Sequence, residues 1–390
     1  MNQEQLQSVF TYIDDHEEEM IRLLQNLVEM ESPSADFERV AKTASHLHTY
    51  CDAVGMHAEL QTFEQGGPCL TAWTQPGNLP PVAMLGHMDT VHPVGSFGPH
   101  PYTRDGDIAR GPGIFDMKGG DVIALFAIRA LMHAGYKKRQ LKLILTGDEE
   151  VAHAYTNGDG GAVAEAFTND CAAVFNCESG QPDAEVTIRR KGGAIFIIRV
   201  YGKAAHAGKE PQKGASAIRQ AAEMICEIER HTEFSSVTYN CGKISGGKGS
   251  NIIPDYCEFN IGLRYVTNEQ YEQAAEMIKD LCDHPVVAGT HCEMSQNGFY
   301  PAMEPVEKTE ALLNVYREAC RIQGYPEPQG VSQGGCSDSA FVTRQGIPAL
   351  CSLGIQGDGA HQPSEYARLS SMKEQCRKLA ACILLLPDDF

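Results

Sequence analysis

The chain of 390 residues contains no apolar run that approaches the roughly 20 residues needed to cross a bilayer. Its longest apolar runs, such as AIFII and CILLL, have the length of strand or helix fragments. The first residues, MNQEQLQSVFTYIDDHEEEM, have neither a basic leader nor an apolar stretch, so we expect no secretory signal and a cytoplasmic location. Repeats and low-complexity linkers are also missing. With 42% hydrophobic and 21% charged residues, the composition is that of a globular protein, and disorder is excluded.

Paired cysteine motifs are absent as well. The 14 cysteines include no CxxC pair and lie in apolar segments such as ALCSL and AACILLL. Disulfide frameworks and cysteine metal sites therefore fit poorly, and buried reduced thiols are the better interpretation.

Basic residues are in deficit, with 32 lysines and arginines against 51 acids and a formal charge of −19. Such a charge repels nucleic acids and anionic membranes. A small anionic substrate remains compatible, because local arginines or a metal could hold it. The expected partner is therefore a small molecule, without nucleic acid or membrane.

Short apolar strands alternate with helices in the first half of the chain, which predicts an α/β layer with a mainly parallel sheet. Amphipathic spacing at Ile21, Leu24, Leu27 and Val28 predicts a first helix. The other expected helices are 37–54 and 119–135, and the expected strands are 81–89, 141–147 and 171–179.

The pattern of predicted strands and helices changes near residue 189. The order of expected elements becomes strand, helix, strand, strand, helix, strand up to residue 298, which is the ferredoxin-like motif. We therefore predict a catalytic domain formed by 1–188 and 299–390, with an inserted α+β domain at 189–298.

Histidine and acids lie at the ends of three of the predicted strands or directly after them. These residues are His87, Asp89, Glu149, Glu150 and Glu178. In α/β folds ligand sites lie at the carboxyl ends of strands, so these side chains would converge if the strands are neighbours. Residues two apart in a strand share a face, so His87 and Asp89 are expected to point into the same space. The alternative interpretation is that the acids are solvated charges at strand ends.

Two loops add further candidates. In RGPGIFDMKGGD, Asp116 precedes a helix that begins near Gly120, and in GDGAHQPSEYA, His361 follows glycines. An ordinary helix cap and an exposed histidine are the alternatives. Histidines with carboxylates and no cysteine suit zinc, or less well cobalt or manganese.

Seven segments in order resemble the dinuclear zinc hydrolases that include glutamate carboxypeptidase, aminoacylase, acetylornithine deacetylase and succinyl-diaminopimelate desuccinylase. The segments are HMDTV, RGPGIFDMKGG, TGDEE, NCESG, GKAAHAG, NIIPD with a following arginine, and the late histidine. They span nearly the whole chain. The resemblance implies a zinc-hydrolase catalytic domain, with the insert as a lid and dimerisation domain.

The resemblance also implies roles for the strand-end residues. His87, Asp116 and Glu178 would bind one Zn²⁺, and Asp116 would bridge to a second Zn²⁺ held by Glu150 and His361. Glu149 would be the general base, and Asp89 would orient His87. In the family a cis peptide follows the bridging aspartate, here between Asp116 and Met117.

In the insert, His206 resembles the histidine that reaches across a homodimer to stabilise the oxyanion. Asn251, Arg264 and the backbone near Gly335 resemble the groups that grip the substrate carboxylate. An exposed strand-end histidine and a structural ion pair are the alternatives for His206 and Arg264. Cys336 is read as a packed residue rather than a nucleophile.

His92, His100 and His153 match no ligand position and are expected to be exposed or behind the ligands. The segment GDEEVAHAYTNGDGG is longer and more polar than the family pattern, so the pocket rim is expected to be individual.

The prediction is a zinc-dependent exopeptidase of the glutamate-carboxypeptidase type, which cleaves a small peptide and works as a homodimer. The GPG before Asp116 and the spacing from NIIPD to its arginine favour that branch. An N-acyl amino-acid deacylase is the alternative within the family. A non-catalytic binding relative and a structural dimerisation protein are alternatives of other classes.

Overall fold

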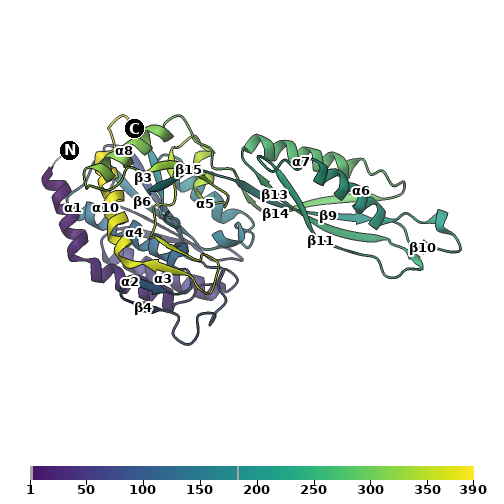
Figure 1. The fold of residues 1–390 in the computed structure, drawn as a ribbon, viewed down its shortest axis with the longest axis horizontal. Helices are drawn as coiled ribbons and strands as arrows, with labels where there is room; N and C mark the ends of the chain where they lie inside the picture. The colour runs from purple at the N-terminus through teal and green to yellow at the C-terminus, as the bar shows by residue number, and fades with distance from the viewer. Residues whose placement is uncertain (1–2, 182–183) are drawn as a thin grey trace. The chain divides into compact units, whose positions relative to one another are not determined.

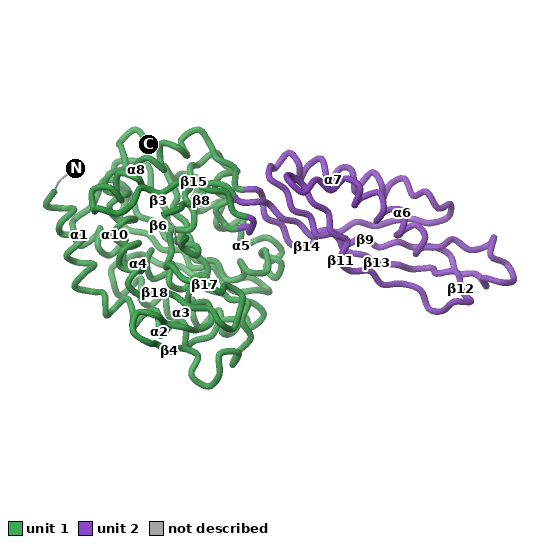
Figure 2. Tube along the Cα trace, viewed as in Figure 1, with its two compact units in different colours: residues 1–189, 303–333, 337–390 green, residues 190–302, 334–336 purple. Residues whose placement is uncertain are grey.

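The computed structural model describes residues 3–181 and 184–390. The chain forms two compact units, coloured separately in Figure 2. Unit 1 comprises residues 1–189, 303–333 and 337–390, and unit 2 comprises residues 190–302 and 334–336. Unit 2 is therefore inserted into unit 1, which the chain leaves at residue 190 and, for three residues only, again at residue 334.

A six-stranded sheet forms the centre of unit 1, in the order β1-β2-β6-β3-β7-β16. Pairs β6-β3, β3-β7 and β7-β16 are parallel, whereas β1-β2 and β2-β6 are antiparallel. This is the mixed, mainly parallel sheet that the sequence predicts. Its strands are β1 (His57–Gln61), β2 (Cys69–Trp73), β3 (Leu79–His87), β6 (Arg139–Thr146), β7 (Ala173–Asn176) and β16 (Ala349–Leu350).

Both faces of the inner strands of this sheet are buried, whereas the edge strand β1 is partly exposed, and Figure 1 shows helices around the sheet. Val82 and Met84 of β3 point into one apolar core, while Ala83 and Leu85 point into another. A strand covered on both sides needs apolar residues at successive positions, which explains the continuous run VAML. The helices are α1 (Gln3–Asp15), α2 (Glu17–Glu29), α3 (Phe37–Ala53), α4 (Gly119–His133), α5 (Asp159–Thr168), α8 (Thr309–Arg321), α9 (Ser339–Thr343) and α10 (Leu369–Leu385).

Local sequence explains the helix positions. The four apolar residues predicted to form one face lie in α2 and are all buried. Helix α3 begins after Asp36, whose side chain accepts a hydrogen bond from the backbone N–H of Arg39, an N-cap. Helix α4 is apolar almost all round, and its residues are buried from Gly119 to Leu131 with few exceptions, as expected of a helix inside the core.

A smaller sheet brings a late loop to an early one. Its order is β17-β18-β5-β4, and Tyr366 of β18 pairs with Arg110 of β5. The pairing holds the segment that contains His361 beside the loop that leads to Asp116. The strands are β4 (Thr103–Asp105), β5 (Ile108–Arg110), β17 (Gly357–Asp358) and β18 (Tyr366–Arg368), and a separate pair joins β8 (Glu185–Arg190) to β15 (Gln329–Gln333).

Unit 2 has the predicted ferredoxin-like architecture, with an antiparallel sheet in the order β11-β13-β9-β14. Along β13, alternate residues from Cys257 to Tyr265 are buried against the helices, and those between them are more accessible. One face of this sheet therefore carries the core of the unit. The elements are β9 (Gly192–Tyr201), β10 (Ala205–His206), α6 (Ala217–Arg230), β11 (Thr238–Gly246), β12 (Ile252–Ile253), β13 (Tyr256–Tyr265), α7 (Asn268–Asp283) and β14 (His291–Tyr300).

All 14 cysteines lie within the described residues as free thiols, and most are buried, as predicted. In the described part of the chain, no helix combines the length and the apolar character that a membrane span requires.

Candidate metal centre

The candidate centre lies at the carboxyl ends of three adjacent strands of unit 1. His87 is the last residue of β3, Glu149 and Glu150 lie in the short turn after β6, and Glu178 follows β7. Strands β6, β3 and β7 are parallel neighbours, so their ends meet at one edge of the sheet. This is the convergence that the sequence predicts.

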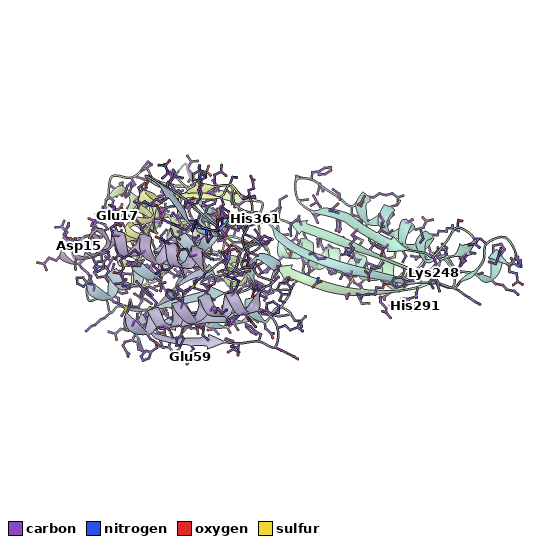
Figure 3. The ribbon with its side chains drawn as sticks, turned by 90° about the horizontal axis from the view of Figure 1, so that it is seen from below. Asp15, Glu17, Glu59, Lys248, His291 and His361 are labelled. Carbon is purple, nitrogen blue, oxygen red and sulfur yellow. The ribbon has the colours of Figure 1, made fainter. Side chains whose placement is uncertain are left out.

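Asp116 lies between the two histidines. Its Oδ1 is 3.5 Å from Nε2 of His87, and its Oδ2 is 3.3 Å from Nε2 of His361. His361, labelled in Figure 3, is also 3.1 Å from Oε2 of Glu150. One carboxylate oxygen is thus presented to each side, which is the arrangement a bridging ligand needs.

Glu149 and Glu178 approach the same nitrogen of His87 as Asp116 does. Nε2 of His87 is 3.9 Å from Oε2 of Glu149 and 3.8 Å from Oε1 of Glu178. Two sets of potential ligands have atoms within 4.8 Å of one another. The sets are His87, Asp116 and Glu150, and His87, Glu149 and Glu178. They share His87, whereas the family resemblance divides the ligands at Asp116.

Asp116 is not a helix cap. The N-cap position of α4 is Lys118, and no side chain caps the helix there. The peptide bond from Asp116 to Met117 is cis, as the resemblance implies. Gly113 before it has a positive φ of 70°, and a Cβ there would lie 2.3 Å from Cγ2 of Thr90. The tight loop therefore requires glycine at that position.

Asp89 lies beside His87, but not for the reason given by strand alternation. Strand β3 ends at His87, so the expected strand 81–89 is two residues too long. Nδ1 of His87 lies 3.0 Å from the backbone oxygen of Asp89, and the Asp89 carboxylate accepts hydrogen bonds from the backbone N–H groups of Glu149 and Glu150. Asp89 therefore fixes the acid pair as well as the histidine.

The acids are not solvated strand-end charges. Glu149 is 8% exposed and Glu178 is 6% exposed. Burial raises the pKa of Glu149 well above its ordinary value, and the charges of Glu178, Asp338 and Glu150 add to this effect. Burial also raises the pKa of Glu150, to which the charge of Asp116 contributes.

The pKa values of the histidines are raised as well, which for an imidazole favours the charged form. Burial lowers the pKa of His87, but hydrogen bonds to Asp116 and Asp89 outweigh burial, and its pKa lies well above the usual value. Hydrogen bonds to Asp116 and Glu150 raise the pKa of His361 to about 10. Five carboxylates thus surround two imidazoles, and even fully protonated histidines leave an excess of negative charge.

The donor set fits divalent cations. Oε1 of Glu150 is buried, and no described residue offers it a hydrogen bond. An unpaired buried carboxylate oxygen is costly unless a cation or water occupies its free side. Carboxylates with imidazoles and no thiolate suit Zn²⁺ and, less well, Mn²⁺ or Co²⁺.

Glu365 is a site residue that the sequence did not reveal. It is fully buried, and its carboxylate accepts hydrogen bonds from the backbone N–H groups of Phe115 at 2.8 Å, Asp116 at 3.0 Å and Gly113 at 3.3 Å. Nε2 of His92 lies 2.6 Å from the same carboxylate. Glu365 thus joins the loop of Asp116 to the segment of His361, and His92 lies behind the ligands rather than at the surface.

His153 is buried in a second supporting network. Its Nδ1 is 2.8 Å from Oδ1 of Asp148, and its Nε2 is 2.7 Å from Oδ1 of Asp338. Hydrogen bonds to both acids and the charge of Asp338 outweigh burial and hold the pKa of His153 well above its usual value. The network anchors the turn that carries Glu149. Of the three unassigned histidines, only His100 is exposed.

In unit 2, His206 and Asn251 lie side by side. Strand β10 pairs His206 with Ile252, and the backbone N–H of Ala207 donates to the backbone oxygen of Asn251. Nδ1 of His206 accepts hydrogen bonds from the backbone N–H groups of Gly208 and Lys209, so the neutral ring carries its proton on Nε2. The exposed edge of the ring is thus a hydrogen-bond donor.

Arg264 lies at the opposite end of the same unit. Its Nη1 is 3.9 Å from Sγ of Cys336, next to Gly335, and Gly193 makes room for its guanidinium. Cys336 contacts this guanidinium and that of Arg190, and no acid pairs with Arg264 among the described residues. His206 and Asn251 lie beyond Tyr256, at the start of β13, and a rise of about 3.3 Å per residue separates that end from Arg264 by roughly 25 Å.

Known proteins share the sequence pattern and the fold. The model of the peptidase family M20/M25/M40 matches residues 83–385. Carboxypeptidase G2 of Pseudomonas sp. strain RS-16 is 24% identical, over 96% of this chain and 91% of that protein.

Solved structures agree in fold. Aminopeptidase PepT of Bacillus cereus has a TM-score of 0.74 at 22% identity, over 95% of this chain and 98% of that one. YxeP of Bacillus subtilis, described as a dinuclear metal-binding peptidase of the M20 family, has a TM-score of 0.64 at 17% identity, over 95% and 99% of the two chains. Because the family model covers more than three quarters of the sequence, the chain belongs to peptidase family M20/M25/M40 and is a metal-dependent hydrolase of that family.

Proposed function

We propose that this chain hydrolyses an amide or peptide bond in a small substrate with a free carboxylate, as a glutamate-carboxypeptidase-like exopeptidase. The observation that carries the proposal is the meeting of ligand candidates from five distant segments at one edge of the sheet, where the buried Glu149 lies beside His87. The similarity to carboxypeptidase G2 supports the exopeptidase branch.

Two zinc ions are the proposed cofactors, with Co²⁺ or Mn²⁺ as substitutes. His87, Glu178 and Asp116 would hold one, and Asp116, Glu150 and His361 would hold the other. When bound, two adjacent divalent cations supply Lewis acidity to a substrate carbonyl and lower the pKa of water. Asp89 keeps the imidazole of His87 and the backbone of Glu149 and Glu150 in position.

Glu149 is the proposed general base. It would accept the proton of the attacking water and return that proton to the departing amine, so one carboxylate serves both steps. Glu149 lies in the short turn after β6, and its Oε2 is 3.9 Å from Nε2 of His87, so its carboxylate is beside the ligand candidates. Removal of the charge by Glu149→Gln therefore removes the base and keeps the shape of the side chain.

The substrate carboxylate is assigned to unit 2. Arg264 offers a planar guanidinium that can donate two parallel hydrogen bonds, and backbone groups near Gly335 lie on the same side. His206 and Asn251 lie at the far end of the sheet, so one chain cannot bring both ends to one substrate through unit 2 alone. We therefore assign His206, as the oxyanion donor, and Asn251 to the partner chain of a homodimer. Strand β11 lies at the edge of its sheet and offers an interface for the second copy.

Mixed dimers test the assignment across chains. His206→Ala and Glu149→Gln proteins are each expected to be inactive. A dimer of one chain of each kind contains one complete site, which combines Glu149 of the first chain with His206 of the second. Random pairing should then restore about a quarter of the wild-type activity. If His206 acts on its own chain, mixing restores none, and the homodimer assignment fails.

A hydrolysis screen tests the activity itself. Dipeptides, folyl-type glutamates, and N-acetyl and N-succinyl amino acids are offered to the zinc-loaded protein with and without chelator. Preference for a C-terminal acidic residue supports the exopeptidase, and preference for N-acyl amino acids selects the deacylase instead. Loss of turnover in Glu149→Gln with zinc retained, but not in the exposed control Glu59→Gln, supports the role of Glu149. No metal-dependent turnover across the panel would leave a non-catalytic relative.

A further inference from the structure

A cavity of about 680 Å³ lies on unit 1 beside the candidate centre, within the size range of ligand pockets. Three segments form its wall, each next to a residue of the site. They are the loop and first turn of α3 from Pro33 to Glu38, the loop from Thr90 to Val94, and Val151 with Tyr155 after the acid pair.

Contacts and chain connections tie this cavity to the centre. Ser34 lines the cavity and donates a hydrogen bond of 2.6 Å to Oδ2 of Asp89. Thr90 directly follows Asp89, and Val151 directly follows Glu150. A ligand in the cavity would therefore touch the segments that hold the acid pair.

The wall of the cavity carries three large apolar side chains that are exposed to solvent. Val91, Val94 and Tyr155 are exposed, at 38%, 45% and 37%. Ile322 is the other exposed large apolar side chain among the described residues of unit 1. The ring of Tyr155 packs edge-on against that of Phe37 at 5.2 Å, which gives the cavity an aromatic wall. Apolar side chains that gather at one concave place mark a ligand site.

The charges of the wall define what it accepts. Asp36 and Glu38 line the cavity; Asp36 is paired with Arg39, whose Nε lies 3.3 Å from its Oδ2, and no lysine or arginine lines the cavity among the described residues. An anionic group would be repelled there, whereas an uncharged apolar group would bury surface without losing a hydrogen bond.

We infer that this cavity is the subsite for the acyl side of the substrate and that it takes an uncharged aromatic or branched apolar group. The inference rests on the proposed function, in which the groups that grip the substrate carboxylate belong to unit 2. The part of the substrate on the other side of the scissile bond is then left to unit 1. Tyr155 comes from the long segment after the acid pair, so this subsite is a specificity feature of the chain.

Matched substrates and variants test the inference. N-benzoyl, N-acetyl and N-succinyl derivatives of one amino acid are compared, with the amino acid chosen by the hydrolysis screen or, if nothing is hydrolysed, glutamate. We expect kcat/KM of the benzoyl compound to exceed that of the acetyl compound at least about tenfold, with the succinyl compound lowest. Val94→Trp fills the cavity and should reduce the benzoyl preference about tenfold, whereas Ile322→Trp, at another exposed apolar residue of unit 1, should leave it unchanged.

Binding separates this inference from the proposed function. Calorimetric titration of the same compounds into zinc-loaded Glu149→Gln protein should show tighter binding of the benzoyl compound, lost when Val94→Trp is added. Selective binding without any hydrolysis by the wild type would overturn the function and keep the subsite. Equal effects of Val94→Trp on all three compounds, or preference for the succinyl compound, would overturn the subsite. A change of oligomeric state in Val94→Trp would assign the cavity to self-association instead.

Discussion

Glu365→Gln tests whether the buried carboxylate behind the ligands decides metal affinity. Glu365 touches neither His87 nor the reacting groups, and its partners are three backbone N–H groups and His92. The substitution keeps the size of the side chain but removes its charge, and it turns one acceptor into a donor. That donor must face either the backbone N–H of Gly113 with His92, or the N–H groups of Phe115 and Asp116.

The magnitude follows from the contacts. Hydrogen bonds to a charged group contribute about 1.5–3 kcal/mol each, and neutral ones about 0.5–1.5 kcal/mol. Three backbone bonds that each weaken by about 1 kcal/mol release the loop of Asp116 by roughly 3 kcal/mol. Only part of this free energy affects the position of Asp116 as a metal ligand. Loss of such a supporting contact typically lowers metal affinity about 10–100-fold. We expect a loss in that range.

Competition with a chromogenic zinc chelator measures the affinity directly, without reference to activity. Glu374→Gln is the matched control, because Glu374 pairs with Lys378 on α10 away from the centre, and its loss should not change zinc binding. Wild-type zinc affinity and stoichiometry in Glu365→Gln would refute the reasoning, since the loop of Asp116 would then hold its place without the carboxylate.

Three further outcomes follow from the structure. His153→Ala leaves Asp148 and Asp338 buried without their shared partner. It should lower the free energy of unfolding, measured by urea titration, by about 3–5 kcal/mol. An unchanged urea midpoint would contradict the network. Burial raises the pKa of Asp121 well above its usual value, so the folded chain keeps a proton that the unfolded chain loses near pH 4. Stability of the metal-free protein should therefore fall as pH rises from about 4 towards the folded pKa, and Asp121→Asn should flatten the dependence of Tm on pH between 5 and 8; parallel curves would refute this. Zinc at a hundred times its Kd should stabilise the protein by about 2.7 kcal/mol, seen as a higher Tm that chelator reverses; no shift would argue against a metal bound to the folded state.

Periodicity predicted helices α2, α3 and α4, strands β3, β6 and β7, and the order of elements in unit 2, but not the small sheet of β4, β5, β17 and β18. The run VAML, buried on both faces, and the alternation along Tyr256–Tyr265 distinguish a covered parallel strand from a half-covered antiparallel one. The order of elements in the insert was likewise sufficient to predict the ferredoxin-like sheet. Side-chain pattern reports which faces are apolar, and burial of those faces is what folding must achieve.

Strand ends predicted where the ligand candidates would meet, but not how they are held. The strand argument placed the Asp89 carboxylate beside His87, and its Oδ1 lies 3.4 Å from Nδ1 of that histidine although β3 ends two residues earlier. It did not reveal the other partners of Asp89, which are Ser34 and the backbone N–H groups of Glu149 and Glu150. Solvated acids and a helix cap remained open alternatives until burial and contacts excluded them.

Only the tertiary structure decided which residues support the ligands and how far apart the proposed substrate-binding residues of unit 2 lie. Glu365 reaches a loop some 250 positions earlier in the chain, and His153 meets Asp338 across a separation of 185. No local pattern marks such residues, because their partners are backbone groups or single acids brought near by chain crossovers. The separation of Arg264 from His206 depends in the same way on the antiparallel pairing of β9 with β13, which puts the two residues towards opposite ends of unit 2 and which sequence spacing does not contain.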